Sequence, residues 1–516
     1  MKKFYALLPF LGLFLIACED DDTPLPTTPD PDPVVITPGS ADFTKYVAVG
    51  NSLTAGFSDN ALFSAGQAAS FPNMLASNFA LAGGGEFTIP FMADNLGGAT
   101  INGVTDANMD GSPDIGNRLI LQFTADGPAP TPKEGTGTTE ITTKLPGPFN
   151  NMGVPGAKSY ELLAPGYGSL AGLAVGAANP YFVRFSSAED ASVIGDAAAQ
   201  APSFFSLWAG SNDILLYATS GGSGTNQLDP TVSPALYARN DITNPLVLAG
   251  ALDGMLQALT ASGAEGVIAN IPSVTDIPFF TTVPHNPVPL DEATAALLNG
   301  AYAAYNGGIV GAFAFLVGQS AISQEDADLE IAKRTISFAA GDTNAVVLID
   351  EDLTDLTGIN AALINMRQAT ADDLLVLTSR SFIGTLANPA DPTSINGVAI
   401  PLEDKWVLTP EEQTAVADAL AAYNATILAL ATQYDLAFVD ANALLSELRA
   451  TGFPLADGSV VTNTFGTGGG FSLDGVHPAP RGYAILANAF LEAINEKYGS
   501  NFPGVNPLNF TGLYID

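Results

Sequence analysis

The 516-residue chain has one cysteine, two histidines and only 17 lysines and arginines, against 53 acidic residues. A lone cysteine, Cys18, excludes a disulfide within the chain. The net charge of −36 argues against nucleic acid as a partner, because an acidic surface repels phosphate, and it disfavours direct attraction to anionic lipid headgroups. Hydrophobic residues nevertheless make up 47% of the chain, which is ample for a large core.

Long apolar runs are also scarce. Lys2 and Lys3 precede a run at 4–17, which is too short for a stable transmembrane helix but typical of a signal peptide. The last residues of this run, with Cys18, resemble the lipobox of bacterial lipoproteins. That resemblance implies cleavage after residue 17 and lipidation of Cys18; the alternative is a plain secretory signal with an incidental cysteine. After residue 17 we expect no run long enough to cross a membrane.

The segment 18–43 is acidic and rich in Pro and Thr, which predicts an extended tether. A diacylated cysteine anchors a chain stably. The acidic run after Cys18 resembles the export signals of some surface lipoproteins. We therefore expect a protein that is lipid-anchored to the cell envelope, at the outer membrane and exposed at the cell surface.

Residues 44–516 show an α/β pattern. Short apolar runs that suit buried strands alternate with helical patterns, which predicts a parallel sheet covered on both faces. Two segments interrupt the pattern: 81–148, expected to form loops and short strands, and 351–408, expected to form a lid or lateral hairpin. The expected strands are 46–50, 203–209, 266–270, 345–350 and 436–440, and the expected helices include 291–317, 409–433 and 483–497.

Small polar residues follow two of the expected strands, and a glycine lies in an expected loop. Ser52 comes directly after the first strand, at the sheet edge where ligands bind in open α/β folds. Asn212 follows the strand at 203–209, and Gly156 lies in a loop that leads into a helix. Backbone and amide N–H groups there can stabilise a developing negative charge. Alternatively, Ser52 and Asn212 cap helices and Gly156 only permits a tight loop.

Near the end of the chain, Asp474 lies three residues before His477. That spacing lets the carboxylate accept a hydrogen bond from one imidazole nitrogen and leaves the other free as a base. The other histidine, His285, lies in a proline-framed loop without a neighbouring acid. A purely structural loop histidine remains the alternative for His477.

These residues supply the groups that acyl transfer requires. Ser52 is the expected nucleophile, His477 its base and Asp474 the acid that orients the base. The Ser52 and Gly156 N–H groups and the Asn212 side chain are the expected oxyanion donors.

The chain resembles the SGNH (GDSL) hydrolase family in four blocks that occur in the family's order: Gly50-Asn51-Ser52-Leu53, Asn-x-Gly-x-x-Gly ending at Gly156, Gly210-x-Asn212-Asp213 and Asp474-x-x-His477. The resemblance implies a flavodoxin-like three-layer α/β/α fold with a central parallel sheet, and ester hydrolysis that requires no cofactor. Asn51 departs from the aspartate usual in the family, which bears on how Ser52 is positioned. Ser52 is not in a Gly-x-Ser-x-Gly elbow, so an α/β-hydrolase is disfavoured.

Three functions fit these residues. The first is a lipase, esterase or acylhydrolase acting on a small-molecule or lipid ester through an acyl enzyme on Ser52. The second is a carbohydrate O-acetyl esterase acting on glycans. The third is a surface lipoprotein that uses the fold for binding without catalysis.

A partial calcium loop lies within the first insertion. Asp106, Asn108, Asp110 and Asp114 occupy positions 1, 3, 5 and 9, and Gly111 occupies position 6. The final glutamate of such a loop is missing. The pattern predicts either a structural calcium site or a turn cluster without metal.

Overall fold

The computed structural model describes residues 35–124 and 127–515. The signal peptide 1–17, the lipidation site Cys18 and most of the tether lie outside the described residues. From Thr37 onward the chain forms one compact unit. The last residues of the segment 18–43, which we expected to belong to the tether, are therefore part of the folded unit. The Phe43 ring, for example, is buried and stacks on Phe79 at 4.2 Å between centroids.

Five parallel strands form the central sheet, in the order β15-β8-β7-β1-β6. Numbered along the chain, the order across the sheet is 2-1-3-4-5. The two strands beside β1 pair with it residue by residue: Ala48 lies opposite Asn151 on one side and Ser206 on the other. The bounds are β1 Tyr46–Gly50, β6 Asn151–Gly153, β7 Phe204–Trp208, β8 Glu265–Ala269 and β15 Ala437–Val439.

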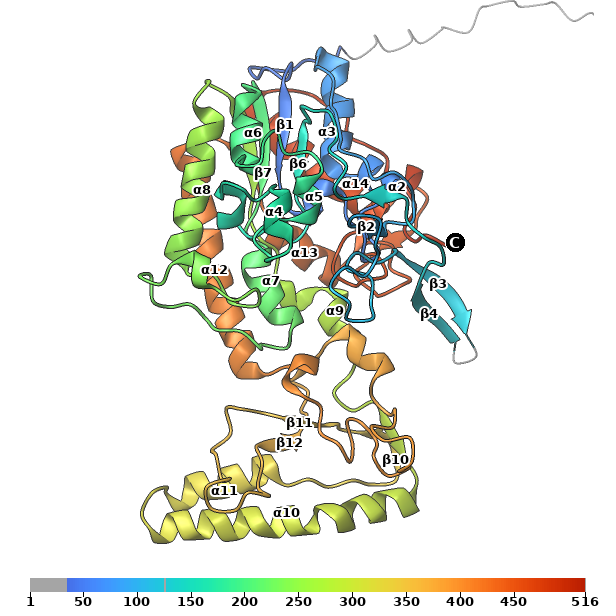
Figure 1. Ribbon diagram of the computed structural model, residues 1–516, viewed down its shortest axis with the longest axis vertical. Coiled ribbons are helices and arrows are strands. Elements are labelled where there is room, and N and C mark those ends of the chain that lie inside the picture. The colour runs from blue at the N-terminus through green and yellow to red at the C-terminus, as the bar shows by residue number, and fades with distance from the viewer. Residues whose placement is uncertain (1–34, 125–126, 516) are drawn as a thin grey trace, which may run out of the picture. The chain divides into compact units, whose positions relative to one another are not determined.

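Helices cover both faces of this sheet, as the α/β pattern predicts (Figure 1). Alternate residues of β7 face opposite ways. Leu207 packs with side chains from one helical layer, whereas Trp208 contacts Phe71 and Phe490 from the other. The first layer contains α6 Val193–Ala199, α8 Pro245–Thr260 and α12 Pro410–Gln433, and the second contains α3 Phe71–Phe79 and α14 Pro480–Tyr498.

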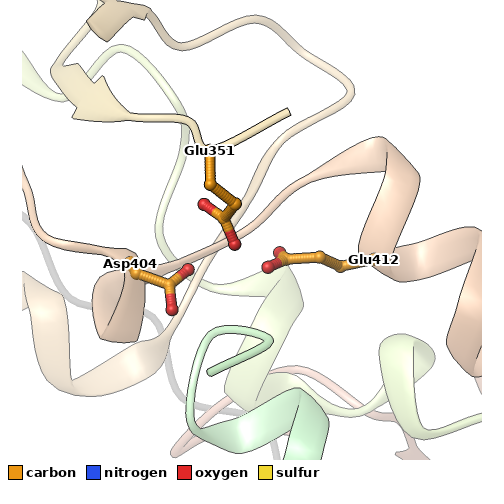
Figure 2. Close-up of side chains that lie close together, drawn as sticks. All are labelled: Glu351, Asp404 and Glu412. Carbon is orange, nitrogen blue, oxygen red and sulfur yellow. The ribbon is translucent and has the colours of Figure 1, made fainter. Parts of the chain in front are cut away.

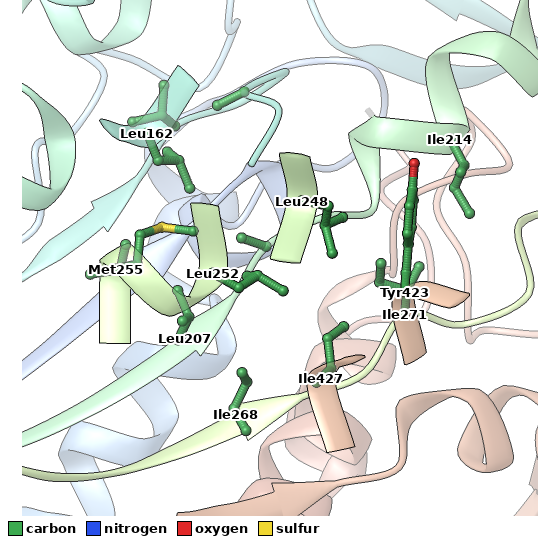
Figure 3. Packing of buried hydrophobic residues seen from close by; sticks show 14 of the residues in the cluster. Leu162, Leu207, Ile214, Leu248, Leu252, Met255, Ile268, Ile271, Tyr423 and Ile427 are labelled. Atoms are coloured by element: carbon green, nitrogen blue, oxygen red, sulfur yellow. The ribbon is translucent and has the colours of Figure 1, made fainter. Parts of the chain in front are cut away.

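The core beneath α8 and α12 is made of branched aliphatic and aromatic side chains (Figure 3). Leu207 and Ile268 project from the sheet towards Leu252 of α8 and Ile427 of α12. Complete burial of such side chains contributes about 1.5–3 kcal/mol each, so this layer fixes the sheet that carries the site.

The strands within 81–148 pair among themselves. β2 Ala99–Thr100 pairs with β5 Thr139–Glu140, and β3 Leu119–Thr124 forms a hairpin with β4 Gly127–Pro132.

A second buried core lies in the segment 283–407, and it corrects two expectations. The strand expected at 345–350 is β11 Val347–Ile349, but it pairs antiparallel with β12 Met366–Gln368 and not with the central sheet. The helix expected at 291–317 is α10 Glu292–Gly318, which packs in this core beside α11 Gln324–Arg334. A short apolar run signals a buried strand but does not identify its partner, so the interruption begins well before residue 351.

Among the residues that the structure describes, two helices are long and apolar enough to span a membrane, which contradicts the expectation that no run after residue 17 would be. They are α10 and α12, with mean hydropathy of 1.3 and 1.4. Both place one face in a buried core. The core helices of water-soluble proteins meet the same criterion, so this is weak evidence for a span.

Candidate active site

Ser52 begins a one-turn helix, α1 Ser52–Ala55, directly after β1. The side chain of Asn51 accepts a hydrogen bond from the Leu53 N–H at 3.1 Å and so caps this turn. Asn51 is buried, and its amide oxygen makes the hydrogen bond that an aspartate could make, without placing a charge there. The serine itself is 6% exposed, so its hydroxyl lies at the floor of a cleft.

Asp474 and His477 lie in the loop before α14, as an acid and a base in contact. The Asp474 Oδ2 atom is 2.9 Å from His477 Nδ1, and Oδ1 accepts the backbone N–H groups of His477 and Val476 at 2.8 Å each. Burial alone would raise the pKa of the Asp474 carboxyl. The neighbouring imidazole and these backbone donors outweigh burial and lower the pKa to about 2.

The imidazole connects this acid to the serine. His477 Nε2 lies 2.9 Å from Ser52 Oγ. An ionised carboxylate only accepts hydrogen bonds, so Nδ1 of the neutral ring donates to Asp474 and Nε2 accepts the Ser52 hydroxyl proton. The Phe57 ring packs on the imidazole at 4.7 Å between centroids and restricts its movement.

The turn at Ser58-Asp59-Asn60, which the sequence argument did not include, holds the loop of Asp474 in place. Ser58 Oγ donates to the Pro478 carbonyl at 3.1 Å, and the Asn60 N–H donates to Asp474 Oδ2 at 2.8 Å. Asp59 and Asn60 both have φ in the left-handed region, at 50° and 62°. Among residues other than glycine, Asp and Asn tolerate that conformation best, so the Asp-Asn pair soon after Ser52 was the sequence signal for this turn.

The side chain of Asp59 is buried beside the acid of the site. Its Oδ1 accepts the Leu473 N–H at 2.9 Å, whereas Oδ2 has no hydrogen-bond partner within the described residues. The Asp59 N–H donates to Ser472 Oγ at 2.9 Å, and that hydroxyl donates to Asp474 at 3.0 Å. Burial is the main reason that the pKa of Asp59 rises to about 7, and the charge of Asp474 raises it further.

The expected oxyanion donors follow the strands on either side of β1. Asn212 begins α7 Asn212–Thr219 after β7, and Gly156 follows β6 with φ of +78°. One N–H of the Asn212 amide donates to the Ala157 carbonyl at 2.8 Å, which ties the two loops together and leaves the second N–H for a ligand. Ser52, Asn212 and His477 line one cleft, whereas Gly156 is not part of its lining.

Asp213 fixes the loop that carries Gly156. Its buried carboxylate accepts the Ser159 N–H at 2.8 Å and the Ser159 hydroxyl at 2.7 Å. Arg239 donates to the Gly156 carbonyl and pairs with Glu161 at 2.9 Å. This loop is therefore held at both ends before any ligand binds.

The cleft is open to solvent, and its walls are apolar. The walls come from α7, the loop after β8, α13 Ala441–Ala450 and α14. Half-buried side chains are available there to contact a ligand. They include Leu215, Leu444, Leu448, Ile485 and Leu486.

The partial calcium loop forms a hydrogen-bonded turn. Asp106 accepts the N–H groups of Asp110 and Gly111, and Asp114 accepts the Ala107 N–H at 2.6 Å. Asn108 accepts the Asp110 N–H at 2.9 Å. Within the part of the chain that the structure describes, these carboxylates do not form a group of converging oxygens. His285, the second histidine, lies away from the site in the segment of the second core, where its carbonyl accepts the Val346 N–H at 3.1 Å.

Comparisons of the chain with family models, with curated proteins and with solved structures gave no match.

Proposed function

We propose that the chain is a serine ester hydrolase of the SGNH type, and that its central sheet is flavodoxin-like. One observation carries the proposal: Asp474, His477 and Ser52 form a continuous series of hydrogen bonds with both ring nitrogens at 2.9 Å from their partners. The strand order 2-1-3-4-5 is the doubly wound order with its switch point at β1, where ligands bind in such sheets.

In the proposed reaction, His477 Nε2 takes the proton of Ser52 Oγ as that oxygen attacks the ester carbonyl. The carbon–oxygen bond to the alcohol then breaks, and the imidazolium returns its proton to the leaving alkoxide. A water, deprotonated by the same nitrogen, attacks the acyl enzyme and releases the acid and Ser52. Asp474 stays ionised throughout and stabilises the imidazolium. All of these groups belong to the chain, so the reaction requires no cofactor.

The negative charge on the tetrahedral intermediate needs donors in place before the reaction. Ser52 and Asn212 line the cleft, so the Ser52 backbone N–H and the second N–H of the Asn212 amide are proposed as donors, with Gly156 as the third. Loss of one such donor typically reduces kcat by about 10²–10³-fold.

The apolar walls of the cleft favour an acyl group with a hydrocarbon chain. Leu444 and Leu448 from α13 line the cleft together with Ile485 and Leu486 from α14, with few polar side chains besides those of the site. A sugar would leave its hydroxyl groups without partners against such walls, which is costly. The glycan O-acetyl esterase is therefore the less favoured alternative.

The test is a panel of p-nitrophenyl esters of increasing chain length with the full chain, Ser52→Ala and a matched control, Ser77→Ala, at an exposed serine of α3. We expect turnover that rises with chain length, none with Ser52→Ala, and full activity with Ser77→Ala. Full activity of Ser52→Ala would overturn the assignment. Selective release of acetate from acetylated glycans would favour the alternative.

A non-catalytic binding protein is distinguished by a fluorophosphonate probe, which labels only an activated serine. We expect labelling of the unaltered chain at Ser52 and none of His477→Ala. If neither chain reacts, the binding function replaces the enzymatic one.

We also propose that the protein is anchored to the cell envelope through a lipid on Cys18, at the outer membrane and exposed at the surface. The lipobox-like residues and the acidic segment after them support this location. Cys18→Ser should abolish labelling by an alkyne fatty acid and release the protein from membranes, and accessibility to added protease in intact cells tests surface exposure.

A further inference from the structure

Three carboxylates converge at a place remote in sequence from the catalytic residues. One oxygen from each of Glu351, Asp404 and Glu412 lies within 4.8 Å of the others. Figure 2 shows the three side chains pointing towards a common centre from separate stretches of backbone. Glu351 follows β11, Asp404 lies before β14 Val407–Leu408, and Glu412 is in the first turn of α12.

Glu412 differs from an ordinary surface acid. The residue is 5% exposed, and its Oε2 atom accepts the Thr409 N–H at 2.7 Å. The other oxygen, Oε1, is buried and has no hydrogen-bond partner within the described residues. A buried acceptor without a donor costs about 1–3 kcal/mol, and more when charged, so this atom is available to coordinate a cation.

The backbone after α7 also lies against Glu412 and Asp404. Gly221 and Gly222, which follow α7, both have φ in the left-handed region, at 68° and 80°. A Cβ atom at Gly222 would lie 1.9 Å from Glu412 Oε1, and one at Gly221 would lie 2.1 Å from the Asp404 carbonyl oxygen. The chain thus approaches the Glu412 carboxylate and the backbone of Asp404 as closely as only glycine allows.

No lysine or arginine of the described residues forms an ion pair with these three carboxylates. Lys333 lies 3.6 Å from Glu411, and Lys405 lies 2.6 Å from Glu403, so both nearby cations pair with neighbouring acids. Like charges in one partly buried place repel each other, and a bound cation would relieve that repulsion.

We propose that Glu351, Asp404 and Glu412 bind a calcium ion. The donor set consists only of hard oxygen atoms and carries three negative charges, which suits Ca²⁺. It offers no imidazole or thiolate, which zinc and copper prefer. Water and backbone carbonyl oxygens would complete the six to eight ligands that calcium takes.

Such an ion would join parts of the fold that otherwise meet through repelling charges. It would hold the loops after β11 and before β14 against the start of α12 and the end of α7. The first residue of α7 is Asn212, the proposed oxyanion donor. The calcium ion would therefore stabilise the junction of the second core with the helix that carries part of the catalytic site, without taking part in the reaction.

The test is calcium binding by the full chain after EGTA has removed bound metal. Isothermal titration calorimetry measures the binding, and the melting temperature measures its effect on stability. We expect one Ca²⁺ per chain with a Kd of about 10⁻⁴–10⁻³ M, as in extracellular sites, and a melting temperature that rises with added CaCl₂. Mg²⁺ at the same concentration should give a smaller rise. Esterase activity is not the readout, so the result is independent of the proposed hydrolase function.

Glu412→Gln and Asp404→Asn should each abolish the response to calcium. In EGTA, both variants should melt at the same temperature as the unaltered chain or at a higher one, because each substitution removes one repelling charge. The matched control, Asp110→Asn, changes the turn at 106–114 and should keep the full response. If Asp110→Asn abolishes binding and Glu412→Gln does not, calcium binds at the other loop and this proposal is wrong. Absence of any bound Ca²⁺ in the unaltered chain would also overturn it.

Discussion

His477 Nε2 lies 2.9 Å from Ser52 Oγ, although 425 positions separate the two residues in the chain. The contact is made by two loops, each fixed by its own backbone: the Asn51-capped turn on one side and the hydrogen-bonded loop of Asp474 on the other. The short turn at Ser58-Asp59-Asn60 joins them. The fold itself therefore holds the His477 ring against the Ser52 hydroxyl.

The first prediction concerns Asp474. We expect Asp474→Asn to reduce kcat by about 10⁴-fold with little change in KM, because an amide that donates to Nδ1 favours the wrong tautomer of His477. Steady-state kinetics on a p-nitrophenyl ester measure this. Circular dichroism and the melting temperature should show a folded protein, and a loss of less than about tenfold would contradict the assigned role.

The second prediction concerns the oxyanion. Asn212→Ala should reduce kcat by about 10²–10³-fold, because the donor acts on charge that develops in the transition state. KM should change little. The matched control is Asn108→Ala at the exposed turn of the first insertion, for which we expect unchanged kinetics. If Asn212→Ala raises KM and leaves kcat intact, the side chain binds the ground state instead.

The third prediction concerns chain-length preference. Leu448→Gln replaces a half-buried wall residue of the cleft with a polar one of similar size. For an octanoate ester we expect kcat/KM to fall about 5–10-fold, given roughly 0.8 kcal/mol per buried methylene, whereas acetate should change less than about twofold. Leu428→Gln, on the exposed side of α12, is the control and should change neither. Equal losses for both esters would show that the acyl chain lies elsewhere.

The fourth prediction concerns stability as a function of pH. The pKa of Asp59 rises to about 7 in the folded protein from an ordinary value of 3.8. Between these values the folded state holds a proton that the unfolded state has lost, so the contribution of Asp59 to stability declines as pH rises from about 4 to 7.

Asp59→Asn removes this titration. Relative to the unaltered chain, the variant should gain stability as pH rises through that range, by roughly 4 kcal/mol at pH 8. Urea unfolding at pH 4.5, 6 and 8 measures the difference. A difference that does not change with pH would mean that Asp59 ionises normally in the folded state.

The fifth prediction concerns the second core. Arg367 is buried and contacts two buried carboxylates: Asp350 through Nε, and Asp373 through both terminal nitrogens at 2.7 and 2.8 Å. Arg367→Ala leaves both acids without this partner and should destabilise the segment by about 3–5 kcal/mol. Limited proteolysis should then cut within 283–407 first. Arg380→Ala, at an exposed arginine of the same segment, is the control and should leave the digestion pattern unchanged.

The local pattern of residues already determined much of this protein. Apolar runs followed by small polar residues predict buried parallel strands with functional groups at their carboxyl ends, and β1, β7, β8 and β15 form as expected because sheet burial follows from periodicity. The pairing of Asp474 with His477 was also predictable, because a spacing of three residues across a glycine brings them together locally. The start of α12 at Thr409 and Pro410 follows from capping chemistry.

Only the tertiary structure decided which distant segments meet. The run at 347–349 has the composition of a sheet strand but pairs with β12, since an apolar run carries no information about its partner. The side chain of Asp59 is buried beside Asp474, and Glu351, Asp404 and Glu412 converge, only because long-range packing places their backbones there. Local preferences of the chain determine helices, strands and turns over a few residues. Which charged side chains and buried oxygen atoms become neighbours depends on the packing of the whole fold.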